Sequence, residues 1–187
     1  EIPVIEDRYH LSKLYRKCRV IARNGSDDEN SGQLYAAGVR LFRSALPIVA
    51  AVQGAAIGGG LGLALMPDFR VAAPEARFSA NFARLGFHQG FGLSVTLPRL
   101  VGPQAAAEML YTGRRVKGEE AVEMGLADKL APIESVRDVA HELAAEIAMS
   151  APLAVRSIRA TLREGLADAV KAATDHEAIE QARLQTT

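Results

Sequence analysis

The sequence predicts a mixed α/β domain, because an apolar strand pattern in its first half is followed by a helical pattern in its second half. Residues 47–52 (PIVAAV) are apolar and partly β-branched without polar alternation, which is typical of a strand buried on both faces. From Gly90 onward the pattern becomes helical, with glycine or proline where helices are expected to end. A length of 187 residues suits one domain with a sizeable core.

Composition and charge exclude several classes of partner. Lys plus Arg and Asp plus Glu number 22 each, so the sequence carries no electrostatic footprint for nucleic acid. Cys18 is the only cysteine, which excludes an internal disulfide and suits a reducing, cytoplasmic location. No apolar stretch reaches the roughly 18 uncharged residues of a membrane span. We therefore expect no nucleic-acid partner, no membrane partner and no metal site.

The N-terminal part of the chain has the least regular pattern. Residues 9–19 are a weakly amphipathic helix candidate and residues 20–21 a strand fragment. Residues 23–33 (RNGSDDENSGQ) form a polar stretch with almost nothing to bury, so we expect a mobile loop. Residues 33–44 have roughly helical spacing and lead into the strand at 47–52.

Short strands and then helices are expected after this strand. Residues 69–73 and 76–80 read as two strands turned at Pro74-Glu75. The last three expected helices have apolar stripes that need a partner surface, either this domain or neighbouring subunits. The predicted helices span 93–100, 104–111, 117–125, 134–149, 152–165 and 168–185, with a strand at 126–130.

Three consecutive glycines, Gly58, Gly59 and Gly60, lie between the buried strand and an apolar segment at 61–66 that we expect to be helical. Glycine allows backbone conformations closed to other residues and lets a ligand approach the main chain closely. The amides of Gly59 and Gly60 would lie unpaired in the first helical turn, where they can hold an anion or an oxygen that becomes negative during a reaction. The alternative is a glycine turn that only permits close packing. Neither a dinucleotide fingerprint nor a phosphate-binding loop fits the spacing.

Three stretches carry a resemblance to a known family. They are PIVAAVQGAAIGGGLGLAL (residues 47–65), DFRVAAPEARF (68–78) and LGFHQGFGLSVTLPRLVGPQAAAEMLYTGRRVKGEEAVEMGLADKLAP (85–132). Together they resemble the enoyl-CoA hydratase/isomerase (crotonase) family over about residues 41–182. The resemblance implies a ClpP/crotonase-like α/β fold of repeated ββα units, with C-terminal helices for trimerisation. We expect a crotonase core at residues 1–132 and a helical trimerisation region at 133–187.

The resemblance also implies a substrate and a way of binding it. Members of the family polarise the thioester carbonyl of an acyl-CoA with two backbone amides, and the second of these maps onto Gly59. Coenzyme A is then part of the substrate, and no separate cofactor is expected. The predicted assembly is a homotrimer or a hexamer.

The first amide of the family comes from an Ala-Gly-x-Asp-Leu loop, which the first forty residues do not contain. Either the chain lacks this amide or a segment beside Ala22 is omitted, and omission is the favoured interpretation; a terminal helix is also expected beyond Thr187. Arg114, Arg115 and Lys117 either meet the CoA phosphates or form a solvated loop, and the second reading is favoured.

Both glutamates that standard hydratases of the family use are replaced. The first maps onto Gly62 and the second onto Phe82. General acid and base groups typically contribute about 10² to 10⁴-fold each, whereas one oxyanion donor contributes about 10² to 10³-fold. We therefore expect a poor standard hydratase, with divergent isomerase, hydrolase or lyase chemistry.

Other residues of the predicted acyl site are assigned by their place in the family pattern. His88 is the candidate acid or base, because an imidazole with a pKa near 6.5 suits proton transfer at neutral pH; the alternative is that it braces the glycine loop. Phe82 is expected in the pocket wall, where an aromatic ring can stack on an unsaturated acyl group. Asp68 and Glu75 are expected to be structural. The expected substrate-binding residues are Gly58, Gly60, Gly62, Phe82, Phe87 and Gly90.

Three hypotheses about function follow. The first is a divergent crotonase-family enzyme that stabilises an enolate or oxyanion of an acyl-CoA. The second is a subunit that binds acyl-CoA without turning it over. The third is a structural member of the assembly that has lost the site.

Overall fold

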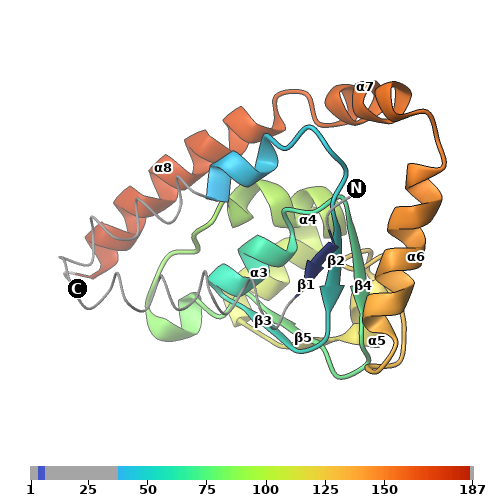
Figure 1. Cartoon of the computed structure of the whole chain (residues 1–187). Helices are drawn as coiled ribbons and strands as arrows, with labels where there is room; N and C mark the ends of the chain where they lie inside the picture. The colour runs from blue at the N-terminus through green and yellow to red at the C-terminus, as the bar shows by residue number, and fades with distance from the viewer. Residues whose placement is uncertain (1–3, 7–37, 186–187) are drawn as a thin grey trace, which may run out of the picture.

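The computed structural model describes residues 4–6 and 38–185, and these residues form two small sheets flanked by helices (Figure 1). The first sheet has the order β1-β2-β4-β7 with parallel neighbours, and the second has the order β3-β5-β6 with only β6 antiparallel. The strands are β1 (Val4–Glu6), β2 (Val49–Val52), β3 (Ala55–Ile57), β4 (Phe69–Ala72), β5 (Arg77–Ser79), β6 (Val116–Lys117) and β7 (Lys129–Leu130).

The helices of the described residues follow the predicted order. They are α3 (Gly59–Ala64), η2 (Ala83–Leu85, a 3-10 turn), α4 (Leu93–Thr112), α5 (Gly118–Glu123), α6 (Val136–Ala148), α7 (Pro152–Leu162) and α8 (Leu166–Leu184). Residues 38–42 are also helical. None of these described helices is both long enough and apolar enough to cross a lipid bilayer.

The chain passes from the first sheet into the second twice. It does so between β2 and β3 at Gln53-Gly54, and between β4 and β5 at the predicted turn Pro74-Glu75. The strands expected at 69–73 and 76–80 are therefore present but belong to different sheets. A helix follows each strand pair, α3 after β3 and α4 after β5, so the predicted fold of repeated ββα units is confirmed.

Strand β2 lies in the middle of the first sheet, and all four of its residues are buried. Val49 pairs with Val4 on one side and with Phe69 on the other. This confirms the prediction from the unbroken apolar run, because a central parallel strand has no face in water.

The predicted strand at 126–130 is wrong at its start. Strand β7 contains only two residues, because the N–H groups of Leu126 and Ala127 both donate to Ala121 O of the preceding helix, at 2.7 and 2.9 Å. The two helices expected at 93–100 and 104–111 are confirmed, because α4 consists of two helical segments that meet in a kink at Gly102, whose φ of 78° and ψ of 164° are not helical. The predicted end of this helix is confirmed, since Gly113 is left-handed with φ 57°.

The two longest C-terminal helices pack on the strands and on α4. Helix α6 covers the first sheet and shares a buried cluster with it through Val136, Ala140 and Ala144. It begins after the predicted boundary at residue 132, yet it belongs to the same core as the strands before that boundary. Helix α8 lies along α4 (Figure 1).

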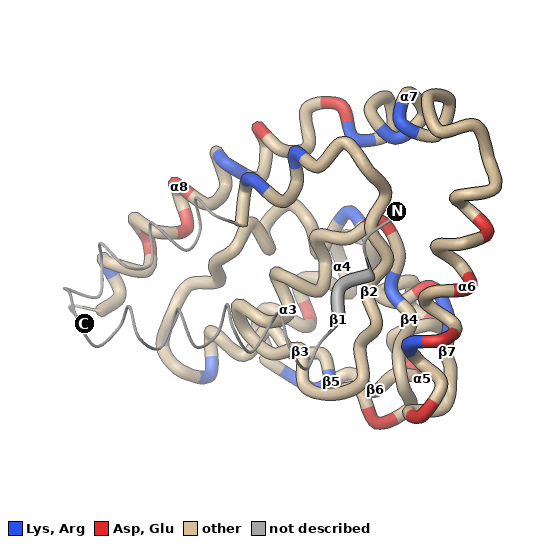
Figure 2. The backbone as a smooth tube through the Cα atoms, viewed as in Figure 1, with Lys and Arg blue, Asp and Glu red and all other residues tan. Residues whose placement is uncertain are grey.

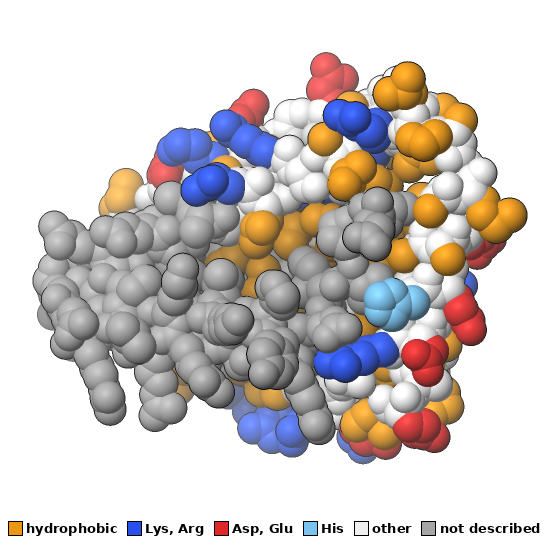
Figure 3. Space-filling model, in the orientation of Figure 1, with side chains coloured by type: hydrophobic (Ala, Val, Ile, Leu, Met, Phe, Trp, Pro, Cys, Tyr) orange, Lys and Arg blue, Asp and Glu red, His pale blue; other side chains and the backbone are white. Residues whose placement is uncertain are grey.

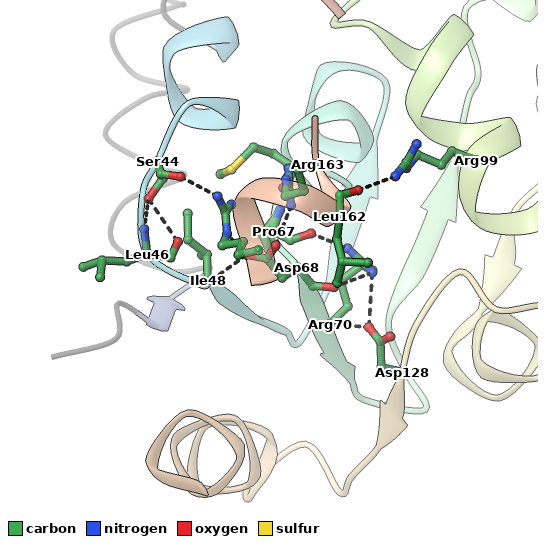
Figure 4. Close-up of polar contacts among 12 residues, drawn as sticks. Ser44, Leu46, Ile48, Pro67, Asp68, Arg70, Arg99, Asp128, Leu162 and Arg163 are labelled. Atoms are coloured by element: carbon green, nitrogen blue, oxygen red, sulfur yellow. Dashed lines mark hydrogen bonds and ion pairs between the residues drawn. The ribbon is translucent and has the colours of Figure 1, made fainter. Parts of the chain in front are cut away.

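Helix α7 is attached to the core by arginines that converge on Asp68 (Figure 4). Arg159 Nε lies 2.9 Å from Asp68 Oδ2, and Arg163 donates to Asp68 Oδ1 at 2.8 Å and to Met66 O at 2.8 Å. The N–H of Ile48 also donates to Asp68 Oδ2, at 2.8 Å. Burial lowers the pKa of Arg163, and the attraction of Asp68 opposes this shift. Asp68 thus has the structural role that the sequence predicts.

Helix α7 and the end of α6 expose apolar side chains to solvent. Leu153 is 78%, Ile158 59%, Leu162 67% and Met149 89% exposed. Figure 3 shows hydrophobic side chains gathered over this part of the molecule. Along the backbone, α5 carries only acidic residues, α7 carries only basic residues, and α8 carries both (Figure 2).

Some predictions fall outside the described part of the chain. These concern the helix at 9–19, the strand fragment at 20–21, the loop at 23–33 and Cys18. Strand β1 was not predicted, because three residues are too few to carry a periodic pattern.

Candidate functional site

The three consecutive glycines form the turn between β3 and α3, and the first of them sets its shape. Gly58 is buried with φ 58° and ψ −122°, a conformation that L side chains rarely adopt. Its N–H donates to Ser79 O at 2.9 Å, and its own carbonyl accepts the N–H of Gly62 at 3.2 Å. The strand β5 and the helix α3 therefore fix the backbone at this turn.

The backbone conformation does not require glycine at Gly59 or Gly60. Both lie in the first turn of α3, neither has a positive φ, and a Cβ at either position would have no described heavy atom within 4 Å. Gly59 is exposed, and its N–H has no hydrogen-bond acceptor among residues 4–6 and 38–185. This amide is free to donate to an oxygen brought in from outside, at the positive end of the short helix.

Phe82 lies beside this turn, as the family pattern implies. It precedes η2, is partly buried against the main core, and its Cζ is 3.7 Å from the point where a Cβ on Gly58 would stand. Asn81 Oδ1 lies 3.4 Å from the same point. The structure thus brings Phe82 to the glycine turn that begins at Gly58, although the two are far apart in sequence.

Gly62 faces a side chain that the sequence analysis did not single out. A Cβ at Gly62 would lie 2.5 Å from Phe91 Cβ and 2.7 Å from Phe91 Cγ. Phe91 is 4% exposed and, among the described residues other than glycine, has the only positive φ, 63°. A bulky residue between two glycines, Gly90 and Gly92, was the sequence signal that could have drawn attention to it.

His88 is half-buried and is held mainly by its own loop and by α8. Its Nδ1 lies 2.9 Å from Gln89 O, and its backbone carbonyl accepts Gln181 Nε2 at 2.9 Å. The ring stands edge-on to His176, with centroids 6.0 Å apart. No carboxylate of the described residues hydrogen-bonds to the ring, so both readings, acid/base and brace, are compatible with the geometry. Nearby, Phe87 is 40% exposed and Gly90 is buried.

A buried glutamate from α8 holds the loop that follows His88. Glu177 is 0% exposed, and it accepts the N–H of Gly92 at 2.7 Å, the N–H of Ser94 at 3.0 Å and the Ser94 hydroxyl at 2.6 Å. The two N–H groups are unpaired backbone donors at the start of α4, so Glu177 acts as a remote N-cap. No local pattern could reveal this role, because the partners are 83 and 85 positions away.

The basic run at 114–117 and a surface groove have surroundings that differ from those of the glycine turn. Arg114 pairs with Glu108 at 2.9 Å and with Glu120, and the hydrogen bond to Glu120 raises its pKa. This pairing favours the solvated-loop reading of the basic run at 114–117. Separately, an open groove of about 320 Å³ lies between the turn at Pro74 and residues 130–134; it contains Glu75 but none of the predicted acyl-site residues.

Comparisons with known sequences and structures all find proteins of one family. The model of the family described as Enoyl-CoA hydratase/isomerase matches residues 18–187. The chain is 39% identical to the crotonyl-CoA hydratase of Syntrophomonas wolfei over 132 residues, which are 71% of this chain and 51% of that protein. It is 41% identical to the carnitinyl-CoA dehydratase of Citrobacter koseri over 117 residues, which are 63% of this chain and 45% of that protein. The chain therefore spans about half the length of these curated relatives.

Solved structures of the same kind share the fold. An enoyl-CoA hydratase from Bacillus halodurans matches with a TM-score of 0.78 and 25% identity, over 90% of this chain and 69% of that one. An enoyl-CoA hydratase/isomerase from Pseudoalteromonas atlantica matches with a TM-score of 0.75 and 28% identity, over 80% of this chain and 60% of that one.

Proposed function

Because the chain belongs to the enoyl-CoA hydratase/isomerase family, we propose that it binds an acyl-CoA thioester and stabilises an enolate or oxyanion of that thioester through backbone amides. The observation that carries the proposal is the Gly59 N–H, which is exposed, lies in the first turn of α3 and has no acceptor among the described residues. A donor that is already fixed in place does not need to reorganise when charge develops on the carbonyl oxygen, and one such donor is worth about 10² to 10³-fold in rate. Coenzyme A enters as part of the substrate, with no separate cofactor.

The chemistry we propose is not standard hydration. Hydration needs one group that activates water and another that protonates the α-carbon, and Gly62 and Phe82 offer neither. An isomerase, hydrolase or lyase reaction that proceeds through the stabilised enolate or oxyanion remains compatible with these residues. The Phe82 ring beside Gly58 supplies an apolar wall for the acyl group.

His88 is the proposed proton-transfer group. Its Nδ1 lies at hydrogen-bond distance from Gln89 O, and a carbonyl oxygen only accepts, so we assign the proton to Nδ1 and the free lone pair to Nε2. The bond from Gln181 to the His88 carbonyl limits movement of the residue. This arrangement suits Nε2 as a base.

The second candidate function is a subunit that binds acyl-CoA without turnover, or one that is only structural. The absence of both carboxylates favours it, as do the exposed apolar side chains of α7, namely Leu153, Ile158 and Leu162. We propose that these side chains are covered in a homotrimer or hexamer. Sedimentation of the purified protein tests this assembly, and a monomer at micromolar concentration would contradict it.

Calorimetry with a panel of acyl-CoAs separates the candidates. Binding of one of them supports the first or second candidate, whereas no heat with any of them leaves only the structural role. Loss of enoyl absorbance with crotonyl-CoA then measures hydration, and a rate like that of ordinary hydratases would contradict our reading of Gly62 and Phe82.

Two substitutions test the proposed residues directly. Gly59→Ala is expected not to lower the melting temperature, since the added Cβ meets no described atom and alanine favours the helix, but to weaken acyl-CoA binding by crowding the thioester. His88→Ala is expected to remove most of any turnover, and His176→Ala, its ring neighbour on α8, is the matched control that should retain it. Equal turnover in the two histidine variants would identify His88 as a brace.

A further inference from the structure

Phe91 occupies the space that a side chain at position 62 would need. Gly62 is buried in α3, and a Cβ there would overlap Phe91, with 2.5 Å to its Cβ and 2.8 Å to its Cδ1. Real Cβ atoms essentially never come within 3.0 Å of another heavy atom. Any residue except glycine at position 62 therefore requires Phe91 to move.

Phe91 has little freedom to move. Its ring is also close to Gly38, where a Cβ would lie 2.7 Å from Phe91 Cζ, so the ring is enclosed between two glycines. The side chain is 4% exposed and packs in a cluster with Phe42, Leu63 and Val170.

The backbone at Phe91 is strained, which points to a role for the ring. Its φ of 63° lies in the left-handed region, which is costly for a bulky residue and natural for glycine. The neighbours Gly90 and Gly92 are glycines, so the loop does not lack residues suited to this conformation. Packing of the ring against Gly62 is the compensation that the structure offers for the strain.

We propose that Phe91 determines the reaction type of this chain, because its ring occupies the space that a proton-transfer side chain at position 62 would need. The inference rests on the proposed function. Positions 62 and 91 are then a mutually exclusive pair, in which either a reactive side chain stands at 62 or an aromatic ring stands at 91. With the ring in place, this side of the acyl site is apolar and holds no group that can activate water, so proton transfer falls to the loop that contains His88.

The steric part of the proposal is tested by melting temperatures. Gly62→Ala should lower the melting temperature by roughly 3 to 10 °C, as expected for overpacking in a chain of this size. Gly60→Ala, two residues earlier on the same helix with no described atom within 4 Å, is the matched control and should not lower it. Phe91→Gly removes the clashing Cβ and suits the positive φ, so the double variant Gly62→Ala/Phe91→Gly should melt higher than the sum of the two single effects predicts. Strictly additive effects, or a Gly62→Ala variant as stable as the control, would overturn the exclusion.

The functional part is tested with crotonyl-CoA. Gly62→Glu alone should not hydrate it measurably faster than the unmodified protein, whereas Gly62→Glu/Phe91→Gly should do so by about 10²-fold, the lower end of what one acid or base contributes. No gain in the double variant, or an equal gain in the single variant, would overturn the assignment of reaction type to Phe91. Calorimetry of the unmodified protein with crotonyl-CoA runs in parallel. An absence of binding would contradict the proposed function. The melting temperatures would still decide whether a side chain at position 62 and the ring of Phe91 exclude each other.

Discussion

Glu177 offers a test of how the C-terminal helix supports the candidate site, because its carboxylate is fully buried and accepts three hydrogen bonds. In Glu177→Ala the N–H of Gly92 loses its acceptor in a buried position, which costs about 1 to 3 kcal/mol. Ser94 is exposed, so its N–H and hydroxyl can return to water and contribute about 0.5 to 1.5 kcal/mol each. Relief from holding a buried charge offsets part of this loss.

The expected net loss in Glu177→Ala is about 2 to 4 kcal/mol, which corresponds to a fall in melting temperature of roughly 4 to 15 °C for a chain of this length. Glu177→Gln should be nearly as damaging, because its amide group presents N–H donors to the donors of Gly92 and Ser94. Thermal unfolding followed by circular dichroism measures both variants. Hydrogen exchange at the amides of Gly92 and Ser94 should be faster in both.

Asp175→Asn is the matched control on the same helix. Asp175 is 63% exposed and pairs with Lys171 at 2.6 Å, so its replacement should change stability by no more than about 0.5 kcal/mol. A Glu177→Gln variant with the melting temperature of the unmodified protein and the same slow hydrogen exchange at the amides of Gly92 and Ser94 would refute the argument. That result would show that one acceptor oxygen is enough.

Two further predictions concern contacts that hold the scaffold together. Asp68→Ala leaves the buried guanidinium groups of Arg159 and Arg163 without their carboxylate, so we expect a loss of about 3 to 5 kcal/mol in urea unfolding. Faster proteolysis within α7 should accompany it, and cleavage at the unmodified rate would contradict the anchoring role. Gly118→Ala would place a Cβ 1.9 Å from Ala73 O, a backbone atom, so we expect a loss of about 1 to 3 kcal/mol in the same assay. Unchanged stability would show that the first turn of α5 shifts freely.

The parts of the fold that the sequence could predict have local signals. The unbroken apolar run of β2 indicates a central strand, and the glycine after Thr112 indicates where α4 ends. In both cases the residues that carry the signal are the ones whose backbone adopts the structure. The break predicted at Gly102 is present, because glycine readily adopts its positive φ and the following Pro103 suits the first turn of the next helical segment.

The site was predictable only where the family pattern applies. The resemblance placed Gly59 and Phe82 at the same site, and the structure brings Phe82 to the turn before α3. Phe91 and Glu177 were missed, because their roles depend on partners in other elements. A phenylalanine against a distant glycine and a glutamate that caps another helix produce no periodicity or motif.

The four glycines between residues 58 and 62 are required for three different physical reasons, and this difference supports a ligand at the turn. Gly58 is required by its backbone conformation, and Gly62 is required by the ring of Phe91. Neither reason applies to Gly59 or Gly60, since their backbones suit any residue and no described atom crowds them. Alanine would form the first turn of α3 better than glycine, by about 1 kcal/mol per residue. A sequence that keeps glycine there forgoes that stability and leaves open space over an unpaired amide, which is what a thioester that approaches the main chain would need.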